Sequence, residues 1–169
     1  MMKLVGATLI LIGSGGIGFM MAAGYRNQGL ALQQLLRALE YMGCDLQYRM
    51  TPLPELCSGA AQVCTGCVKN VLHSLSDELD KQAAPDAVAG MKAVVSQYPN
   101  LPGKLQECLV LLGDSLGRFD LSGQLQGLTS VKKQAQMELE QLRANQDLRL
   151  RNYQTLGLCT GAALVVLFL

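Results

Sequence analysis

Six cysteines and a single histidine are the side chains of this sequence best able to do chemistry. Cys57, Cys64 and Cys67 are spaced i, i+7 and i+10, which predicts that they share one face of a helix, and His73 follows six residues later. Cys64 and Cys67 form a C-x-x-C pair, the spacing of a zinc knuckle or of a dithiol redox centre. A membrane-anchored cysteine module that binds a metal or does redox chemistry is therefore an alternative function.

Missing features of the sequence favour a purely structural role for these cysteines. A structural zinc site usually combines two such pairs, and the sequence has only one C-x-x-C. A thioredoxin-like centre belongs to a β-α-β setting, and no strand is predicted around the pair. Cysteine also serves as a small apolar residue on a buried helix face. We therefore expect no metal and no cofactor.

A second motif, at residues 13–18, fits the dinucleotide-binding pattern G-x-G-x-x-G. Glu40 stands at the distance expected of the ribose-binding acid, but the residues before it have the three-four spacing of a helix and contain no second strand. The apolar run also continues past the glycines, because residues 4–24 carry no charge. Roughly 20 such residues cross a bilayer core, so residues 1–25 are predicted to form a transmembrane helix. Ser14 and Gly18 are then small residues available for packing between membrane helices.

The end of the chain repeats this pattern. Residues 155–169 are uncharged, and Tyr153 is suited to the membrane interface, so residues 153–169 are predicted to form a second transmembrane helix. Three arginines precede this span, which by the positive-inside rule places the intervening domain, residues 26–152, in the cytoplasm. A rival interpretation makes the first apolar run a secretory signal cleaved near Ala23, and the rest a secreted helical protein with disulfides.

The central domain is predicted to be a small all-α bundle, because its long segments show helical spacing and none alternates. The expected helices cover about 28–49, a segment that begins at Pro52 with Thr51 as its N-cap, and then 68–81, 86–97 and 104–116. A last helix should run from Leu121 into the second span. Its heptad-like apolar seam over 121–142 could pack within the chain or between the chains of a homo-oligomer.

Composition excludes several classes of function. The net charge is +1, there is no tryptophan, and acidic and basic residues are interspersed, so nothing indicates a nucleic-acid surface. No catalytic serine–histidine–aspartate order, H-E-x-x-H, P-loop or apolar carboxylate pair is present. We therefore expect a protein that is not an enzyme.

Two blocks of the central domain and the C-terminal tail resemble the stage III sporulation protein AB family. In the segment 35–56 the resemblance rests on a Tyr-x-x-Thr-Pro-Leu-x-Glu block, and in 111–124 on a Leu-Gly…Leu-Gly…Asp…Gln block. The residues of these blocks, which are also candidate partner contacts, are Tyr48, Thr51, Pro52, Leu53, Glu55, Leu112, Gly113, Gly117, Asp120 and Gln124. Each block is first of all a helix corner, where a cap or a glycine serves the fold.

The resemblance implies a role in endospore formation. Members of the family belong to a membrane assembly of the mother cell, built with other stage III sporulation proteins. Their cytoplasmic domain is similar to the platform protein of type II secretion, which couples a cytoplasmic ATPase to a membrane machine. By this resemblance the chain is expected to be a two-pass membrane protein that binds partners, including such an ATPase.

Overall fold

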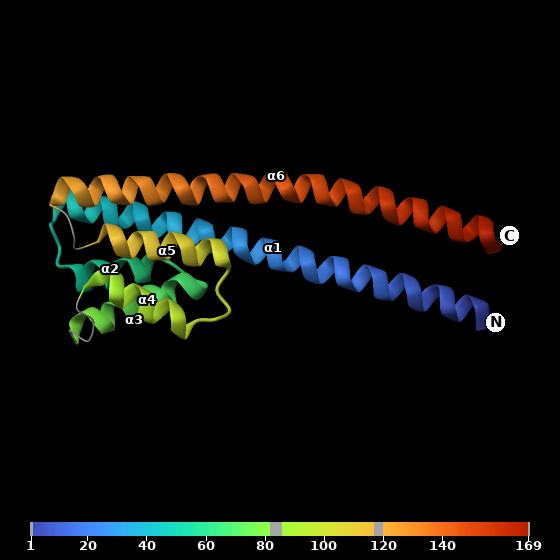
Figure 1. Cartoon of the computed structure of the whole chain (residues 1–169), viewed down its shortest axis with the longest axis horizontal. Helices are drawn as coiled ribbons and strands as arrows, with labels where there is room; N and C mark the ends of the chain where they lie inside the picture. The colour runs from blue at the N-terminus through green and yellow to red at the C-terminus, as the bar shows by residue number, and fades with distance from the viewer. Residues whose placement is uncertain (1, 82–85, 117–119, 169) are drawn as a thin grey trace. The chain divides into compact units, whose positions relative to one another are not determined.

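The described chain is entirely helical. The computed structural model describes the backbone of residues 2–81, 86–116 and 120–168, and the side chains of 24, 26–81, 86–116 and 120–144. Within these ranges there is no strand, which confirms the predicted all-α class. The helices (Figure 1) are α1 (Met2–Tyr48), α2 (Leu53–Val63), α3 (Gly66–Asp80), α4 (Ala87–Gln97), α5 (Gly103–Ser115) and α6 (Leu121–Phe168).

The chain divides into two compact units. Unit 1 contains residues 1–29 and 140–169, and unit 2 contains residues 30–139. Among residues with described side chains, no helix is long and apolar enough to cross a membrane. The predicted spans 1–25 and 153–169 fall almost wholly outside those residues, as do Ser14 and Gly18, so they stay predictions.

Helix α1 is longer than the sequence led us to expect. The segments predicted separately before and after residue 26 form one continuous helix. No proline interrupts them, and isolated glycines such as Gly24 are tolerated inside a helix at a cost of about 1 kcal/mol each. The predicted continuity of α6 into the C-terminal segment is confirmed for the backbone.

Unit 2 is built on an antiparallel pair, the last part of α1 and the first part of α6. Lys132 on α6 pairs with Glu40 on α1 at 2.9 Å, and towards the end of α1 Gln47 lines one groove with Leu125, near the start of α6. Leu39 and Leu128 are buried along this pair. The three-four spacing of α1 turns a continuous apolar stripe towards the core, as the sequence predicted. The stripe consists of Leu32, Leu35, Ala38, Leu39, Met42 and Leu46.

Helices α2 to α5 complete the core, and two glycines allow the backbones to approach closely. A Cβ atom on Gly113 of α5 would lie 2.6 Å from the Cβ of Met91 on α4. A Cβ atom on Gly127 of α6 would lie 2.7 Å from the Cβ of Ser115 on α5. These contacts also fix direction: the end of α5 lies beside the beginnings of both α4 and α6.

Two local predictions are wrong. The helix that was expected to carry Cys57 and Cys67 on one face breaks at Cys64, where the backbone is extended, and Gly66 adopts a φ of 68°. Glycine is the residue that takes this left-handed conformation without steric cost. The start of α2 also differs: the N-cap is Pro52, with ψ of 146°, and no side chain caps the helix. Thr51 is therefore not the cap.

Candidate functional site

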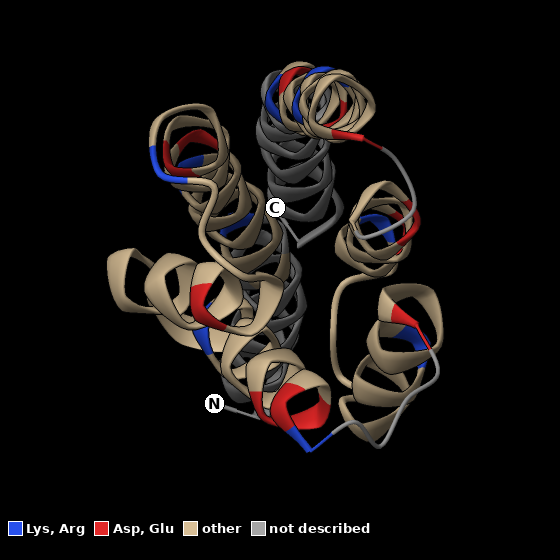
Figure 2. Ribbon diagram, turned by 90° about the vertical axis from the view of Figure 1, so that its left-hand side faces the viewer, with Lys and Arg blue, Asp and Glu red and all other residues tan. Residues whose placement is uncertain are grey.

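Six helix termini meet at one end of unit 2, where α1, α3 and α5 end and α2, α4 and α6 begin. We call this the corner end; it faces the viewer in Figure 2. The hydroxyl of Ser76, near the end of α3, donates to the carbonyl of Pro54 in the first turn of α2 at 2.9 Å. Together with the Gly113 and Gly127 contacts, this bond shows that neighbouring helices are antiparallel. The boundaries of unit 2, Leu30 and Leu139, lie inside α1 and α6 and not at the corner end.

The two blocks that the sequence singled out lie together at the corner end. The Tyr-x-x-Thr-Pro-Leu-x-Glu block forms the connection from α1 to α2, and the second block joins α5 to α6. The structure therefore joins on one surface two segments that are far apart in the sequence. These two blocks and the residues beside them form the candidate site.

The first block presents a protruding apolar surface. Tyr48 is 80% exposed, and its neighbour Met50 is 71% exposed and holds a φ of 52°, which is unusual for a residue with a side chain. The backbone N–H of Met50 donates to the carbonyl of Asp45 at 3.2 Å, which closes the end of α1. Pro52 and Glu55 are exposed, and Thr51 and Leu53 are half-buried. Most of this block is thus available to a partner.

The second block is divided between core and surface. Leu112 and Gly113 are buried, so they have no surface to offer a partner and serve the packing of α5 against α4. Asp120 is exposed, and its carboxylate accepts from the N–H of Gly123 at 3.1 Å, which caps α6. Gln124 is half-buried in the first turn of α6. Gly117 lies outside the described residues.

Asp45 is the residue of this end that sequence reasoning missed. Its side chain is only 7% exposed, and its Oδ2 is buried with no hydrogen-bond partner among the described residues. Its Oδ1 lies 3.9 Å from the guanidinium of Arg49, a side chain that is itself 76% exposed. The sequence held a signal, because Asp45 follows Met42 by three residues on the apolar stripe of α1, where a charge is out of place.

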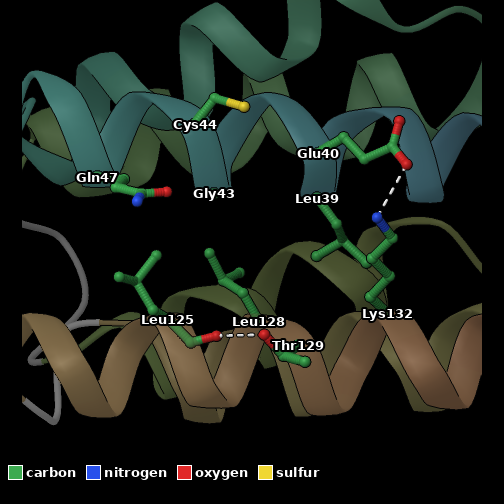
Figure 3. A pocket seen from close by; sticks show the side chains of 9 residues that line it. All are labelled: Leu39, Glu40, Gly43, Cys44, Gln47, Leu125, Leu128, Thr129 and Lys132. Carbon is green, nitrogen blue, oxygen red and sulfur yellow. Dashed lines mark hydrogen bonds and ion pairs between the residues drawn. The ribbon is translucent and has the colours of Figure 1, made fainter.

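A groove between α1 and α6 begins beside the corner end (Figure 3). Its volume is about 620 Å³, and it is lined by Leu39, Glu40, Gly43, Cys44, Gln47, Leu125, Leu128, Thr129 and Lys132. Apolar side chains share this lining with the Glu40–Lys132 ion pair and the exposed thiol of Cys44. The charged residues of this lining are Glu40 and Lys132, and they pair with each other rather than with the thiol. The groove therefore shows no nucleophile–base pair.

The described cysteines give no support to the alternative metal or redox function. Burial raises the pKa of the Cys57 thiol to about 12 and that of Cys108 to about 11, and burial also raises the pKa of Cys64. Such thiols resist forming the thiolate that both chemistries need. The Cys64 thiol instead donates to the backbone carbonyl of Gln34 on α1 at 3.2 Å. In the part of the chain with described side chains, no three histidine, cysteine or acidic residues gather to hold a metal ion.

Comparison with known proteins gives a single family. The family model of stage III sporulation protein AB matches residues 3–169. A relative of that name from Bacillus subtilis (strain 168) is 27% identical over 175 residues, and the match spans the whole of both chains. A solved structure of stage III sporulation protein AB (SpoIIIAB) superposes with a TM-score of 0.64 at 20% identity, and covers 72% of this chain and 98% of its own. That likeness shows the helical fold of the matched region.

Proposed function

The chain belongs to the stage III sporulation protein AB family, and we propose that it is a membrane-bound, non-enzymatic platform whose corner end binds partner proteins of the sporulation assembly. Family membership gives the chain a role in sporulation. The finer role is that of a two-pass protein in the mother-cell membrane, with residues 26–152 in the cytoplasm. There it couples a cytoplasmic ATPase to a secretion-like or channel-like complex.

The observation that carries this proposal is the meeting of the two family blocks at the corner end. Tyr48 and Met50 expose large apolar side chains there, although a monomeric protein gains nothing from leaving them in water. Met50 also sits in a strained left-handed conformation. Exposed aromatic and methionine side chains are typical of the centres of protein interfaces. A partner that covers them would bury this apolar surface.

The absence of a catalytic arrangement in the described residues is compatible with this role but does not establish it. The geometry adds one positive argument, which is the way unit 2 is joined to the rest of the chain. Both connections leave it through Leu30 and Leu139, away from the corner end along α1 and α6.

The proposal is tested by binding of the tagged full-length chain, solubilised in detergent, to the stage III sporulation ATPase of the same bacterium. Tyr48→Ala and Glu55→Gln alter the corner end, and both side chains are exposed, so the fold should tolerate them. Glu107→Gln is the matched control: Glu107 is an exposed acid in α5, away from the corner end, and its contact is a surface pair with Lys104. Surface pairs of this kind contribute roughly 1 kcal/mol or less to stability.

We expect Tyr48→Ala to weaken binding by about tenfold or more, as loss of an aromatic anchor does, and Glu107→Gln to leave it unchanged. Circular dichroism of each variant checks that the helical content is kept. If the wild-type chain does not bind the ATPase at micromolar concentration, coupling to that ATPase is refuted. If binding is equal in all variants, the contact lies elsewhere on the chain.

A further inference from the structure

The corner end is strongly acidic. The corner end consists of the last four residues of α1, α3 and α5, the first four residues of α2, α4 and α6, and the segments that connect these helices at this end. The described residues among these carry eight acids and two bases. The acids are Asp45, Glu55, Asp77, Glu78, Asp80, Asp86, Asp114 and Asp120, and the bases are Arg49 and Lys81. Figure 2 shows red segments on the helix ends nearest the viewer.

The opposite ends of α2 to α5 lack this excess of acids. The last four residues of α2 and α4, the first four of α3 and α5, and the connections between them carry two bases and no acid. These bases are Lys69 and Lys104. Lys104 lies 3.3 Å from both Glu107 and Glu138, so acids outside these termini balance it, whereas the corner end carries an excess of acids.

Helix capping explains only some of the acids at the corner end. Asp86 accepts from the N–H of Ala89 at 2.7 Å and caps α4, and Asp120 caps α6 in the same way. Glu55 lies in the first turn of α2, where a negative charge is favourable. These three acids are stabilising whether or not a partner binds.

The remaining acids are placed where the helix dipole disfavours them. Asp77, Glu78 and Asp80 lie in the last turn of α3, Asp114 in that of α5, and Asp45 in that of α1. The C-terminus of a helix carries partial negative charge, so each such acid costs roughly 0.3–1 kcal/mol when exposed. Asp77 lies 3.4 Å from His73, and Asp45 lies 3.9 Å from Arg49, so these contacts offset part of the cost. Five acids at three helix C-termini are the negative charge that a basic partner would meet at this end.

Asp45 points independently to a missing cation. Its carboxylate is more than nine-tenths buried, Oδ2 has no partner, and the Arg49 guanidinium at 3.9 Å is too far for a hydrogen bond to Oδ1. A buried carboxylate is normally paired, because leaving it unpaired is costly. Asp45 lies in the last turn of α1, three residues before the exposed Tyr48, so its carboxylate belongs to the corner end.

We infer that the corner end docks a basic surface of its partner protein, with one arginine or lysine side chain of the partner pairing with Asp45. Tyr48 and Met50 pack against the aliphatic part of that side chain, and Arg49 is displaced from Asp45 towards solvent. The acids at the ends of α3 and α5 surround this contact and attract the basic surface. The inference rests on the proposed function only for the identity of the partner.

The test measures binding of the full-length chain in detergent to the stage III sporulation ATPase over a range of salt concentrations. Asp45→Asn keeps the shape of the side chain and removes its charge, and a combined variant, Asp77→Asn, Glu78→Gln and Asp80→Asn, neutralises the end of α3. Glu107→Gln removes one acid away from the corner end as the control. A nona-arginine peptide is a second probe, which does not depend on the identity of the partner.

Asp45→Asn is the most informative variant because it should keep or raise stability while it weakens binding to the partner. Removal of a buried charge whose Oδ2 has no hydrogen-bond partner should leave the thermal midpoint equal to or above that of the wild type. Loss of the pair with the partner should weaken binding by at least about tenfold. A residue with a merely structural role would not lose affinity while keeping or gaining stability. The α3 variant should slow association and flatten the salt dependence, and Glu107→Gln should do neither.

The outcomes separate this inference from the proposed function. Binding of the ATPase that ignores salt, Asp45→Asn and the α3 variant overturns the inference and leaves the proposed function intact. If the ATPase does not bind the wild-type chain, the proposed coupling is refuted. Binding of the nona-arginine peptide then tests whether the corner end docks a basic surface. Weaker peptide binding by Asp45→Asn and the α3 variant, but not by Glu107→Gln, then supports a basic partner; equal binding by all four chains overturns it.

Discussion

Replacement of Gly113 by alanine should destabilise unit 2, although alanine favours helix. A new Cβ atom would lie 2.6 Å from the Cβ and 3.1 Å from the Cγ of Met91, and 3.3 Å from the backbone oxygen of Ala87. The Cβ of Met91 cannot move without its helix, so α4 and α5 must separate. Overpacking of this kind costs about 1–3 kcal/mol, and helix propensity returns about 1 kcal/mol.

Gly43→Ala is the matched control, since Gly43 also lies inside a helix but has nothing within 4 Å of the position of a new Cβ. Only the propensity gain remains there, so this variant should be more stable by about 0.5–1 kcal/mol. Because both variants make the same substitution in a helix, the difference between their stabilities isolates the packing cost, about 1–3 kcal/mol.

The assay is urea unfolding of the full-length chain in detergent, followed by circular dichroism, with the slope of the transition checked for constancy. The expected order of stability is Gly43→Ala above the wild type and Gly113→Ala below it. If Gly113→Ala is as stable as Gly43→Ala, the close approach of α4 and α5 is not real. Position 113 would then have room for a side chain, as an exposed position does.

Four further predictions concern individual side chains. Asp86→Ala should lower the free energy of unfolding by about 1 kcal/mol in the same urea assay, because the cap of α4 is lost. Met50→Gly should raise it by about 1 kcal/mol, since glycine takes the φ of 52° without strain. At pH 8 iodoacetamide followed by mass spectrometry should modify the exposed Cys44 and spare Cys57 and Cys108. Burial raises the pKa of the Cys57 thiol from 9.0 to about 12 and that of Cys108 to about 11. The protonated thiols therefore contribute stability that is full below about pH 9 and is lost as the pH rises towards 11–12. Urea unfolding measured from about pH 8 to 11 should show this fall in the free energy of unfolding.

The sequence predicted most of the helices because the three-four apolar spacing stops where helix-breaking residues stand. The three-four apolar spacing placed the boundaries of α3, α4 and α5 within about two residues. The break at Cys64 was missed because it depends on contacts distant in the sequence. The side-chain oxygen of Gln34 accepts from the N–H of Thr65 at 3.0 Å and helps to hold the extended segment against α1. No local pattern encodes that partner.

The site was predicted in its parts but not in its assembly. The sequence singled out Tyr48 and Glu55 in one block and Asp120 in another, yet only the antiparallel order of the helices brings the two blocks together. The acidic character of the corner end was hidden for the same reason, because its acids come from helix termini that are far apart in the sequence. Asp45 was missed because burial, not residue type, makes it unusual.

We expect the corner end to be the surface that meets a partner in the cell. The most direct test is to replace Tyr48 by the photoreactive amino acid p-benzoylphenylalanine and to irradiate sporulating cells. Leu30, 52% exposed on α1 at the other end of unit 2, is the control position. The account predicts a crosslink to the stage III sporulation ATPase from position 48 and none from position 30. A crosslink from position 30 alone would contradict it.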